Sequence, residues 1–229
     1  LTSIKGKASD LIIIYSSSGF TGLGNEAINI TSGTATTSQA NALAAATTGI
    51  VTATISETDM STVTGLTGTG NAYSITIADN TVSASDINTL DSKTSVVINA
   101  TAVTTITGTA ADLITAYTAN LAGTITGLGN EVVIVTDAAP PAASLNTING
   151  FTTGLVDVSA ATIVRGSAAD LVTAYSAKVA GAIVGLGNEP ITVNDFSTVA
   201  QFNVLAANTT GVITATISNG DMTTLNDIT

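Results

Sequence analysis

The chain has 229 residues, of which 45% are hydrophobic and 9% are charged, and its formal net charge is −11. It contains no Cys and no His, which excludes disulfides, thiolate metal sites and Ser-His or Cys-His catalysis. The excess of 16 acidic over 5 basic residues disfavours binding to nucleic acid or to an anionic membrane. No stretch approaches the roughly 18 uninterrupted apolar residues of a spanning helix, so we expect no membrane insertion.

One block of sequence recurs along the chain, which is typical of a repeat architecture. Two copies begin with Thr109-Ala110-Ala111-Asp112-Leu113 and Ser167-Ala168-Ala169-Asp170-Leu171, and an earlier copy begins at Lys7. Each continues to the sequence Gly-Leu-Gly-Asn-Glu, which starts at Gly22, Gly127 and Gly185. We therefore predict a single repeat array over residues 1–229, with approximate repeats 1–32, 33–79, 80–137, 138–195 and 196–229, the first and last truncated.

The first part of each block has the start signal of a helix. The spacing Ser/Thr-x-x-Asp at Thr109 and Ser167 is that of a capping box, in which the hydroxyl and the carboxylate each satisfy an amide at the helix start. Apolar residues follow at helical spacing, so we expect short amphipathic helices that end near Gly123 and Gly181. Degenerate copies, which keep the acid and the next apolar residue, stand at Asp59-Met60 and Asp221-Met222.

A second kind of helix alternates with the first. Its copies share an aligned asparagine, and they cover residues 39–45, 85–90, 143–148 and 201–205. The four aligned residues are Asn41, Asn88, Asn146 and Asn203. We expect these amides to form a ladder that satisfies backbone groups at the turns, as the Asn position of leucine-rich repeats does.

The strands are rich in β-branched residues and are bounded by Gly, Asn and Asp. We predict them at residues 28–30, 50–55, 73–77, 96–98, 132–135, 155–158, 191–193 and 212–217. Alternating strands and helices indicate parallel strands joined by right-handed crossovers, advancing alternately by about 22 and about 36 residues. The predicted fold class is an α/β repeat solenoid, a leucine-rich-repeat-like or β-solenoid rod. The alternative is a series of sandwich modules of about 58 residues, which the helical spacing after each capping box disfavours.

Three aspartates end successive strands and are candidate calcium ligands. Asp79, Asp137 and Asp195 follow one another at intervals of 58 residues, so a solenoid would place them in a ladder along one edge. Hard cations such as calcium take several carboxylate and carbonyl oxygens. The alternative is that each aspartate caps the next helix or closes a turn through its own backbone.

The glutamates that end the Gly-Leu-Gly-Asn-Glu sequence are the remaining repeated acids. Glu26, Glu131 and Glu189 together with the aspartate ladder would supply the two carboxylates of a general acid/base pair, as in glycoside hydrolysis. A repeated acid is more often a repeated structural part, so we expect no catalytic residues. The glycines resemble a phosphate-binding loop only superficially, because the third glycine is missing and a strand follows.

These blocks resemble the tandem repeats of giant bacterial surface proteins, of the type found in cyanobacteria and grouped with haemolysin-type, adhesin or S-layer proteins. The similar blocks are Gly108-Thr109-Ala110-Ala111-Asp112-Leu113, Gly127 to Glu131 and Leu145-Asn146-Thr147-Ile148. The resemblance implies export, calcium-rich surroundings and service as a cell-surface fibre, layer or adhesive stalk. It brings no catalytic residues with it.

The sequence thus favours a structural repeat segment whose partners are neighbouring repeats or copies of itself. The chain begins and stops within a repeat, so we expect its apolar layers to be covered by a further repeat, domain or subunit. The first alternative is an adhesin that binds carbohydrate or a surface. The second is a polysaccharide-active solenoid enzyme, which the scarcity of basic residues disfavours.

Overall fold

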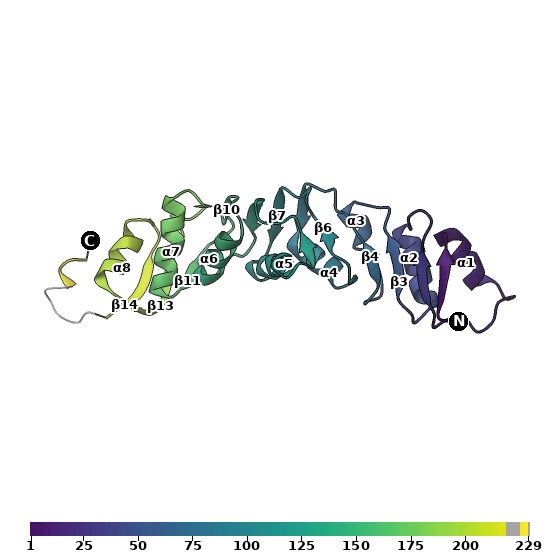
Figure 1. Ribbon diagram of the computed structural model, residues 1–229. Helices are drawn as coiled ribbons and strands as arrows, with labels where there is room; N and C mark the ends of the chain where they lie inside the picture. The colour runs from purple at the N-terminus through teal and green to yellow at the C-terminus, as the bar shows by residue number, and fades with distance from the viewer. Residues whose placement is uncertain (219–224, 229) are drawn as a thin grey trace. The chain divides into compact units, whose positions relative to one another are not determined.

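A computed structural model describes residues 1–218 and 225–228 of this chain as an α/β protein. Parallel strands alternate with helices, and the described residues contain eight helices, which confirms the α/β prediction (Figure 1). The chain divides into two compact units, one of residues 1–103 and 118–128 and the other of residues 104–117 and 129–229. The degenerate copy at Asp221-Met222 lies outside the described residues.

The first unit has a four-stranded parallel sheet whose strands pair in chain order. These strands are β1 (Ser3–Gly6), β2 (Ala27–Ile30), β3 (Val51–Thr54) and β4 (Ala72–Ser74). The intervening helices are α1 (Ala8–Ser16), α2 (Thr37–Ala46) and α3 (Met60–Val63), and α4 (Ala84–Asp91) follows. Three short strands are added, namely β5 (Thr81–Ser83), β6 (Ile98–Asn99) and β8 (Ile125–Thr126), and β6 pairs with β8 in parallel.

The second unit has two groups of parallel strands. One contains β7 (Thr105–Gly108), β9 (Val132–Val135), β10 (Val156–Asp157) and β12 (Ile183–Val184), paired in that order. The other contains β11 (Val164–Gly166), β13 (Ile191–Ser197) and β14 (Ile213–Ile217). The helices are α5 (Ala110–Ala122), whose first part belongs to this unit, α6 (Ala142–Phe151), α7 (Ala168–Val179) and α8 (Val199–Ala206).

The sequence predicts that successive strands advance alternately by about 22 and about 36 residues. In the structure, the residues paired between neighbouring strands are separated by more even distances along the chain. The distance runs from 20 residues for Thr52 opposite Ala72 to 27 residues for Thr105 opposite Val132. The prediction was wrong because the sequence analysis missed β1, β7 and β11, which directly precede the first kind of helix. These strands have three or four residues and no apolar run, so no periodicity marks them.

The core lies between the inward faces of the strands and one face of each helix. In β3, Val51 and Ala53 are buried, and the threonines between and after them are exposed. In α5, the buried residues are Ala110, Leu113, Ala116 and Tyr117, and α7 buries the four equivalent side chains. The first alanine and the leucine of each Ala-Ala-Asp-Leu block therefore face the core, while the aspartate stays at the helix start.

The helices of the first kind begin where the sequence predicts. The amide N of Asp112 donates to Oγ1 of Thr109 (3.2 Å), and the amide N of Asp170 donates to Oγ of Ser167 (3.1 Å). In both helices the hydroxyl also donates to the aspartate carboxylate. The second kind of helix starts with a capping box in which the threonine hydroxyl accepts from the glutamine amide N and the glutamine side chain accepts from the threonine amide N. The pairs are Thr36 with Gln39 and Thr198 with Gln201.

The substitution Ser167→Ala tests the helix start. It removes the acceptor for the Asp170 amide, so we expect a loss of about 0.5–2 kcal/mol in the free energy of unfolding, measured in urea. The matched control is Ser176→Ala on the same helix, whose hydroxyl only bonds back to the Val172 carbonyl (2.7 Å). That change should be neutral or slightly stabilising, since alanine has the highest helix propensity. Equal losses in both variants would contradict the assignment.

Candidate functional site

The most regular cluster of polar side chains in the described residues occurs in three copies, which we call the tyrosine–glutamate turn. Each copy joins a tyrosine from a helix, the glutamate of Gly-Leu-Gly-Asn-Glu, and the first threonine of a Thr-Thr-Gly sequence. The copies are Tyr15 with Glu26 and Thr47, Tyr117 with Glu131 and Thr152, and Tyr175 with Glu189 and Thr209. The first copy lies in the first unit, and the other two lie in the second.

The glutamate carboxylate of each turn is held inside the protein. Glu131 is 1% exposed, and its carboxylate accepts hydrogen bonds from the hydroxyl of Tyr117 and from the amides of Gly129 (2.8 and 3.1 Å) and Asn130 (3.0 Å). Gly129 has a φ of 130°, which side-chain-bearing residues rarely adopt. Consecutive amides that converge in this way form a concave site for an anion, and here the anion is the glutamate of the same turn.

The same hydrogen bonds recur in the other two copies. Glu26 accepts from Tyr15 and from the amides of Gly24 (3.0 and 3.1 Å) and Asn25 (3.3 Å). Glu189 accepts from Tyr175 and from the amides of Gly187 (2.7 Å) and Asn188 (3.0 Å). The second glycine of each turn has a φ of 129° or 130°. The arrangement is therefore one repeated structural part.

The electrostatics of the turn keep the tyrosines protonated. The pKa of Tyr117 and the pKa of Tyr175 lie far above the usual value, first because the phenols are buried and then because each donates to a glutamate. Tyr15 has a raised pKa for the same reasons. The hydrogen bond from Tyr15 lowers the pKa of Glu26, helped by backbone amides and opposed by burial. A carboxylate so occupied is poorly placed to take a proton from a bound substrate.

The threonine connects the turn to the chain about 21 residues later. Oγ1 of Thr152 donates to the carbonyl of Glu131 (2.9 Å) and accepts from the amide of Gly154 (2.9 Å). Thr47 and Thr209 make the same two bonds in their copies. The glycine packs directly against the glutamate carbonyl, so that a Cβ added at Gly154 would overlap it. This close approach explains the glycine in Thr-Thr-Gly.

The substitution Gly154→Ala tests this close approach. The added methyl group overlaps the Glu131 carbonyl, so we expect a loss of about 1–3 kcal/mol in the free energy of unfolding. Gly150→Ala is the matched control, because Gly150 lies within α6 and an added Cβ meets nothing within 4 Å. The control should gain about 0.5–1 kcal/mol from helix propensity. A tolerated Gly154→Ala would contradict the packing described.

The substitution Tyr117→Phe tests the hydrogen bond to the buried carboxylate. It leaves Glu131 with one donor fewer, and we expect a loss of about 1.5–3 kcal/mol, the range for hydrogen bonds to charged groups. Tyr73→Phe is the control, because the Tyr73 hydroxyl is buried with no hydrogen-bond partner and burial raises its pKa to about 12. Its removal should be neutral or stabilising in the same urea titration. Equal effects at both positions would argue against the role assigned to Tyr117.

The three predicted aspartates accept hydrogen bonds at helix starts. The carboxylate of Asp79 accepts from the amide of Met60 (2.6 Å), that of Asp137 from Ala110 (2.6 Å), and that of Asp195 from Ala168 (2.7 Å). Each helix lies before its aspartate in the chain, so the capping alternative had the right role but the wrong helix. The cause is the parallel crossover, which brings the end of a strand back to the start of the helix before it. Glu57, which the sequence analysis missed, does the same for the Thr37 amide (3.1 Å).

Calcium at these aspartates stays a prediction. Within the described residues, no group of three or more acidic side chains lies close enough together to hold a metal ion. The structure therefore does not bring Asp79, Asp137 and Asp195 into one cluster, and each already has a backbone donor.

The substitution Asp137→Ala tests the cap that links β9 to α5. Losing the acceptor for the Ala110 amide should lower the free energy of unfolding by about 0.5–2 kcal/mol. Asp137→Asn keeps an oxygen acceptor and should retain most of that stability. If the alanine variant were as stable as the wild-type chain, the cap would not contribute.

Chelation tests the calcium prediction directly. If the aspartates hold calcium, EGTA lowers the melting temperature and excess calcium restores it, because a ligand that binds only the folded state stabilises that state. Magnesium at the same ionic strength is the control for screening. An unchanged melting temperature would count against bound calcium.

The aligned asparagines Asn41, Asn146 and Asn203 behave as expected. The amide nitrogens of Asn41, Asn146 and Asn203 donate to the carbonyls of Gly65 (2.8 Å), Asp170 (2.9 Å) and Asp227 (2.7 Å). In each case the carbonyl lies 24 residues later. These side chains therefore satisfy backbone groups of the following part of the chain.

The hydrogen bonds from the tyrosines to the glutamates were not predicted from the sequence. A signal existed, because Tyr117 and Tyr175 each stand 14 residues before their glutamate. Tyr15 stands only 11 residues before Glu26, which obscures the pattern. The bonds of the Thr-Thr-Gly threonines to the glutamate carbonyls were likewise not predicted.

Comparison with known proteins gives no further guide to function. No family model, curated protein or solved structure matches the chain. Among the helices of the described residues, none has both the length and the apolar character needed to cross a membrane.

Proposed function

We propose that this chain is a structural repeat segment of an extracellular filament, surface layer or adhesive stalk, without catalytic activity. In this proposal its strand–helix segments form a solenoid in which each coil is completed by the next. The observation that carries the proposal is the recurrence of identical hydrogen bonds at a fixed distance along the chain. The asparagine bonds reach 24 residues ahead, and the Thr-Glu bonds join residues 20 or 21 apart.

Bonds of this kind link each segment only to its neighbour in sequence, which is the arrangement of quasi-one-dimensional repeat proteins. The parallel pairing of β1, β2, β3 and β4 in chain order supports the same organisation. Stiffness then comes from many equivalent contacts, each of modest energy. A stalk or layer needs this mechanical continuity more than it needs a reactive group.

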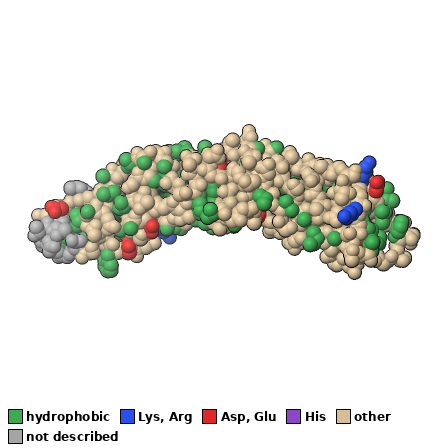
Figure 2. All heavy atoms as spheres, viewed as in Figure 1, with side chains coloured by type: hydrophobic (Ala, Val, Ile, Leu, Met, Phe, Trp, Pro, Cys, Tyr) green, Lys and Arg blue, Asp and Glu red, His purple; other side chains and the backbone are tan. Residues whose placement is uncertain are grey.

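The chemistry of the repeated acids supports a role without catalysis. Glu26, Glu131 and Glu189 are at most 3% exposed and accept bonds from within their own turns. Charged side chains are also sparse on the face drawn in Figure 2, as expected for a chain with 9% charged residues. Most of that face shows uncharged polar side chains and backbone, with hydrophobic side chains scattered among them (Figure 2).

Electron microscopy of the intact protein that carries this segment tests the proposal. We expect rods or a regular lattice, and protease treatment of whole cells should remove the protein if it is on the surface. A dispersed globular protein with measurable turnover of a polysaccharide would overturn the proposal. Saturable binding to one glycan without any rod or lattice would favour an adhesin instead.

A further inference from the structure

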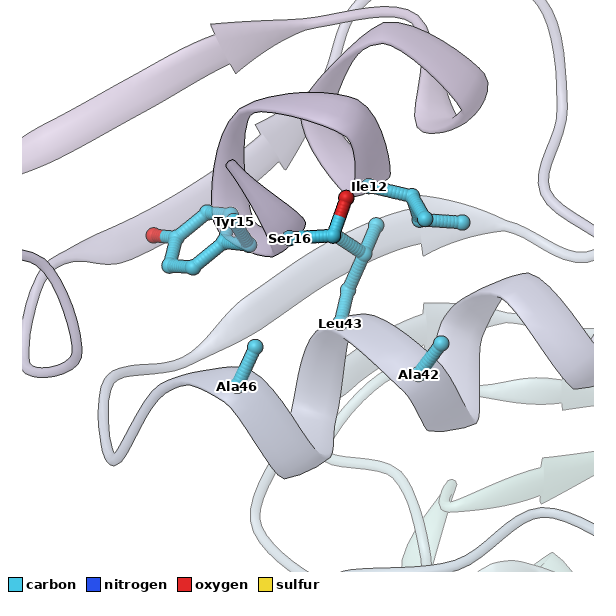
Figure 3. A pocket seen from close by; sticks show the side chains of 6 residues that line it. All are labelled: Ile12, Tyr15, Ser16, Ala42, Leu43 and Ala46. Atoms are coloured by element: carbon cyan, nitrogen blue, oxygen red, sulfur yellow. The ribbon is translucent and has the colours of Figure 1, made fainter. Parts of the chain in front are cut away.

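The first tyrosine–glutamate turn borders a pocket between α1 and α2. The pocket has a volume of about 210 Å³. It is lined by Ile12, Tyr15, Ser16, Ala42, Leu43 and Ala46 (Figure 3). Tyr15 belongs to the turn, and Ala46 adjoins it because it directly precedes Thr47.

In the second copy, an aromatic ring occupies the corresponding position. Phe151 precedes Thr152 just as Ala46 precedes Thr47, and its ring stacks on Tyr117 with a centroid distance of 5.5 Å and an interplanar angle of 12°. Tyr117 is then 1% exposed, whereas Tyr15 is only half-buried. The first copy therefore lacks the ring that covers its tyrosine.

The third copy buries its tyrosine without an aromatic ring at this position. Asn208 stands at the position of Phe151, and Nζ of Lys178, from the end of α7, donates to the Asn208 carbonyl (3.3 Å). Tyr175 is fully buried. In the first copy α1 ends at Ser16, one residue after Tyr15, so no further helical turn exists to do the same. The open tyrosine face is thus specific to the first copy.

We propose that this pocket binds a small neutral molecule with a single aromatic ring, stacked on Tyr15 where Phe151 stacks on Tyr117. The hydrogen bond to Glu26 fixes the orientation of the Tyr15 ring. Offset-stacked rings about 4.5–7 Å apart are favourable, and apolar cavities of about 150 Å³ take up benzene. The proposal is independent of the filament function.

The lining chemistry selects this class of ligand. Ile12, Ala42, Leu43 and Ala46 supply apolar walls, and no charged side chain lines the pocket. The Ser16 hydroxyl already donates to the carbonyl of Ile13 (3.1 Å). A sugar or an ion would lose its hydration without gaining enough polar partners, whereas an uncharged ring would gain the apolar contacts.

Toluene is the probe for the test, because it is the side chain of phenylalanine. Titration of the 229-residue chain, followed by NMR, should show saturable binding with the largest shifts at Ala42, Ala46 and Tyr15. Ala46→Phe fills the pocket with the protein's own ring and should weaken toluene binding at least tenfold. Absence of saturable binding, or binding unaffected by Ala46→Phe in a folded variant, would overturn the proposal.

Phe151→Ala is the reciprocal variant. It should create a second toluene site, with new shifts at Tyr117, while the first site keeps its affinity. The shift map on the wild-type chain tests the proposal even if Ala46→Phe does not fold, since shifts confined to other residues would refute it. N-acetylphenylalanine amide is the second probe, because it distinguishes a site for a free aromatic molecule from a site for a phenylalanine side chain of a peptide. Binding of this compound but not of toluene would also refute a small-molecule site.

Discussion

The buried carboxylate of the tyrosine–glutamate turn is the interaction on which the regularity of this chain depends. A carboxylate removed from water is stable only when its oxygens accept hydrogen bonds, because an uncompensated charge costs roughly several kcal/mol in desolvation. Glu131 meets this condition with the amides of its own turn and the hydroxyl of Tyr117. The turn therefore requires glycine at 129 and a tyrosine at one position of the preceding helix.

The carbonyl of the same glutamate extends this constraint along the chain. It accepts the Thr152 hydroxyl and lies against Gly154, so Thr-Thr-Gly is required where the next helix ends. The aspartate caps act in the same direction, since Asp137 returns to the start of α5. Each strand–helix segment is thus held by side chains from the segment that follows it.

One strand–helix segment of the first unit lacks the glutamate. Tyr73, which follows Gly68-Thr69-Gly70-Asn71-Ala72, takes the place of the glutamate, because its carbonyl accepts the Thr94 hydroxyl (2.7 Å) as the Glu26 carbonyl accepts that of Thr47. There the side chain of Asn71 accepts from the Val51 amide (2.9 Å), and Thr94 bonds to the backbone of Tyr73. A parallel bridge joins Asn71 to Thr94. Backbone pairing therefore persists without the carboxylate. The copies differ in the side chains around the turn, and the pocket beside Tyr15 lies at one such difference.

The sequence by itself determined the alternation of strands and helices, the starts of α5 and α7, and the alignment of Asn41, Asn146 and Asn203. These features follow from capping residues, from apolar periodicity and from the recurrence of similar sequence blocks along the chain. Only the tertiary structure decided that Tyr117 bonds to Glu131, that Asp137 caps the helix before it, and that Ala46 leaves a pocket. It also revealed the short strands β7 and β11. In each case the partner lies well outside the local sequence, since Tyr117 and Glu131 are 14 residues apart and Ala110 and Asp137 are 27 residues apart. Local patterns of side chains cannot identify such partners, because only the packing of parallel strands and helices brings them together.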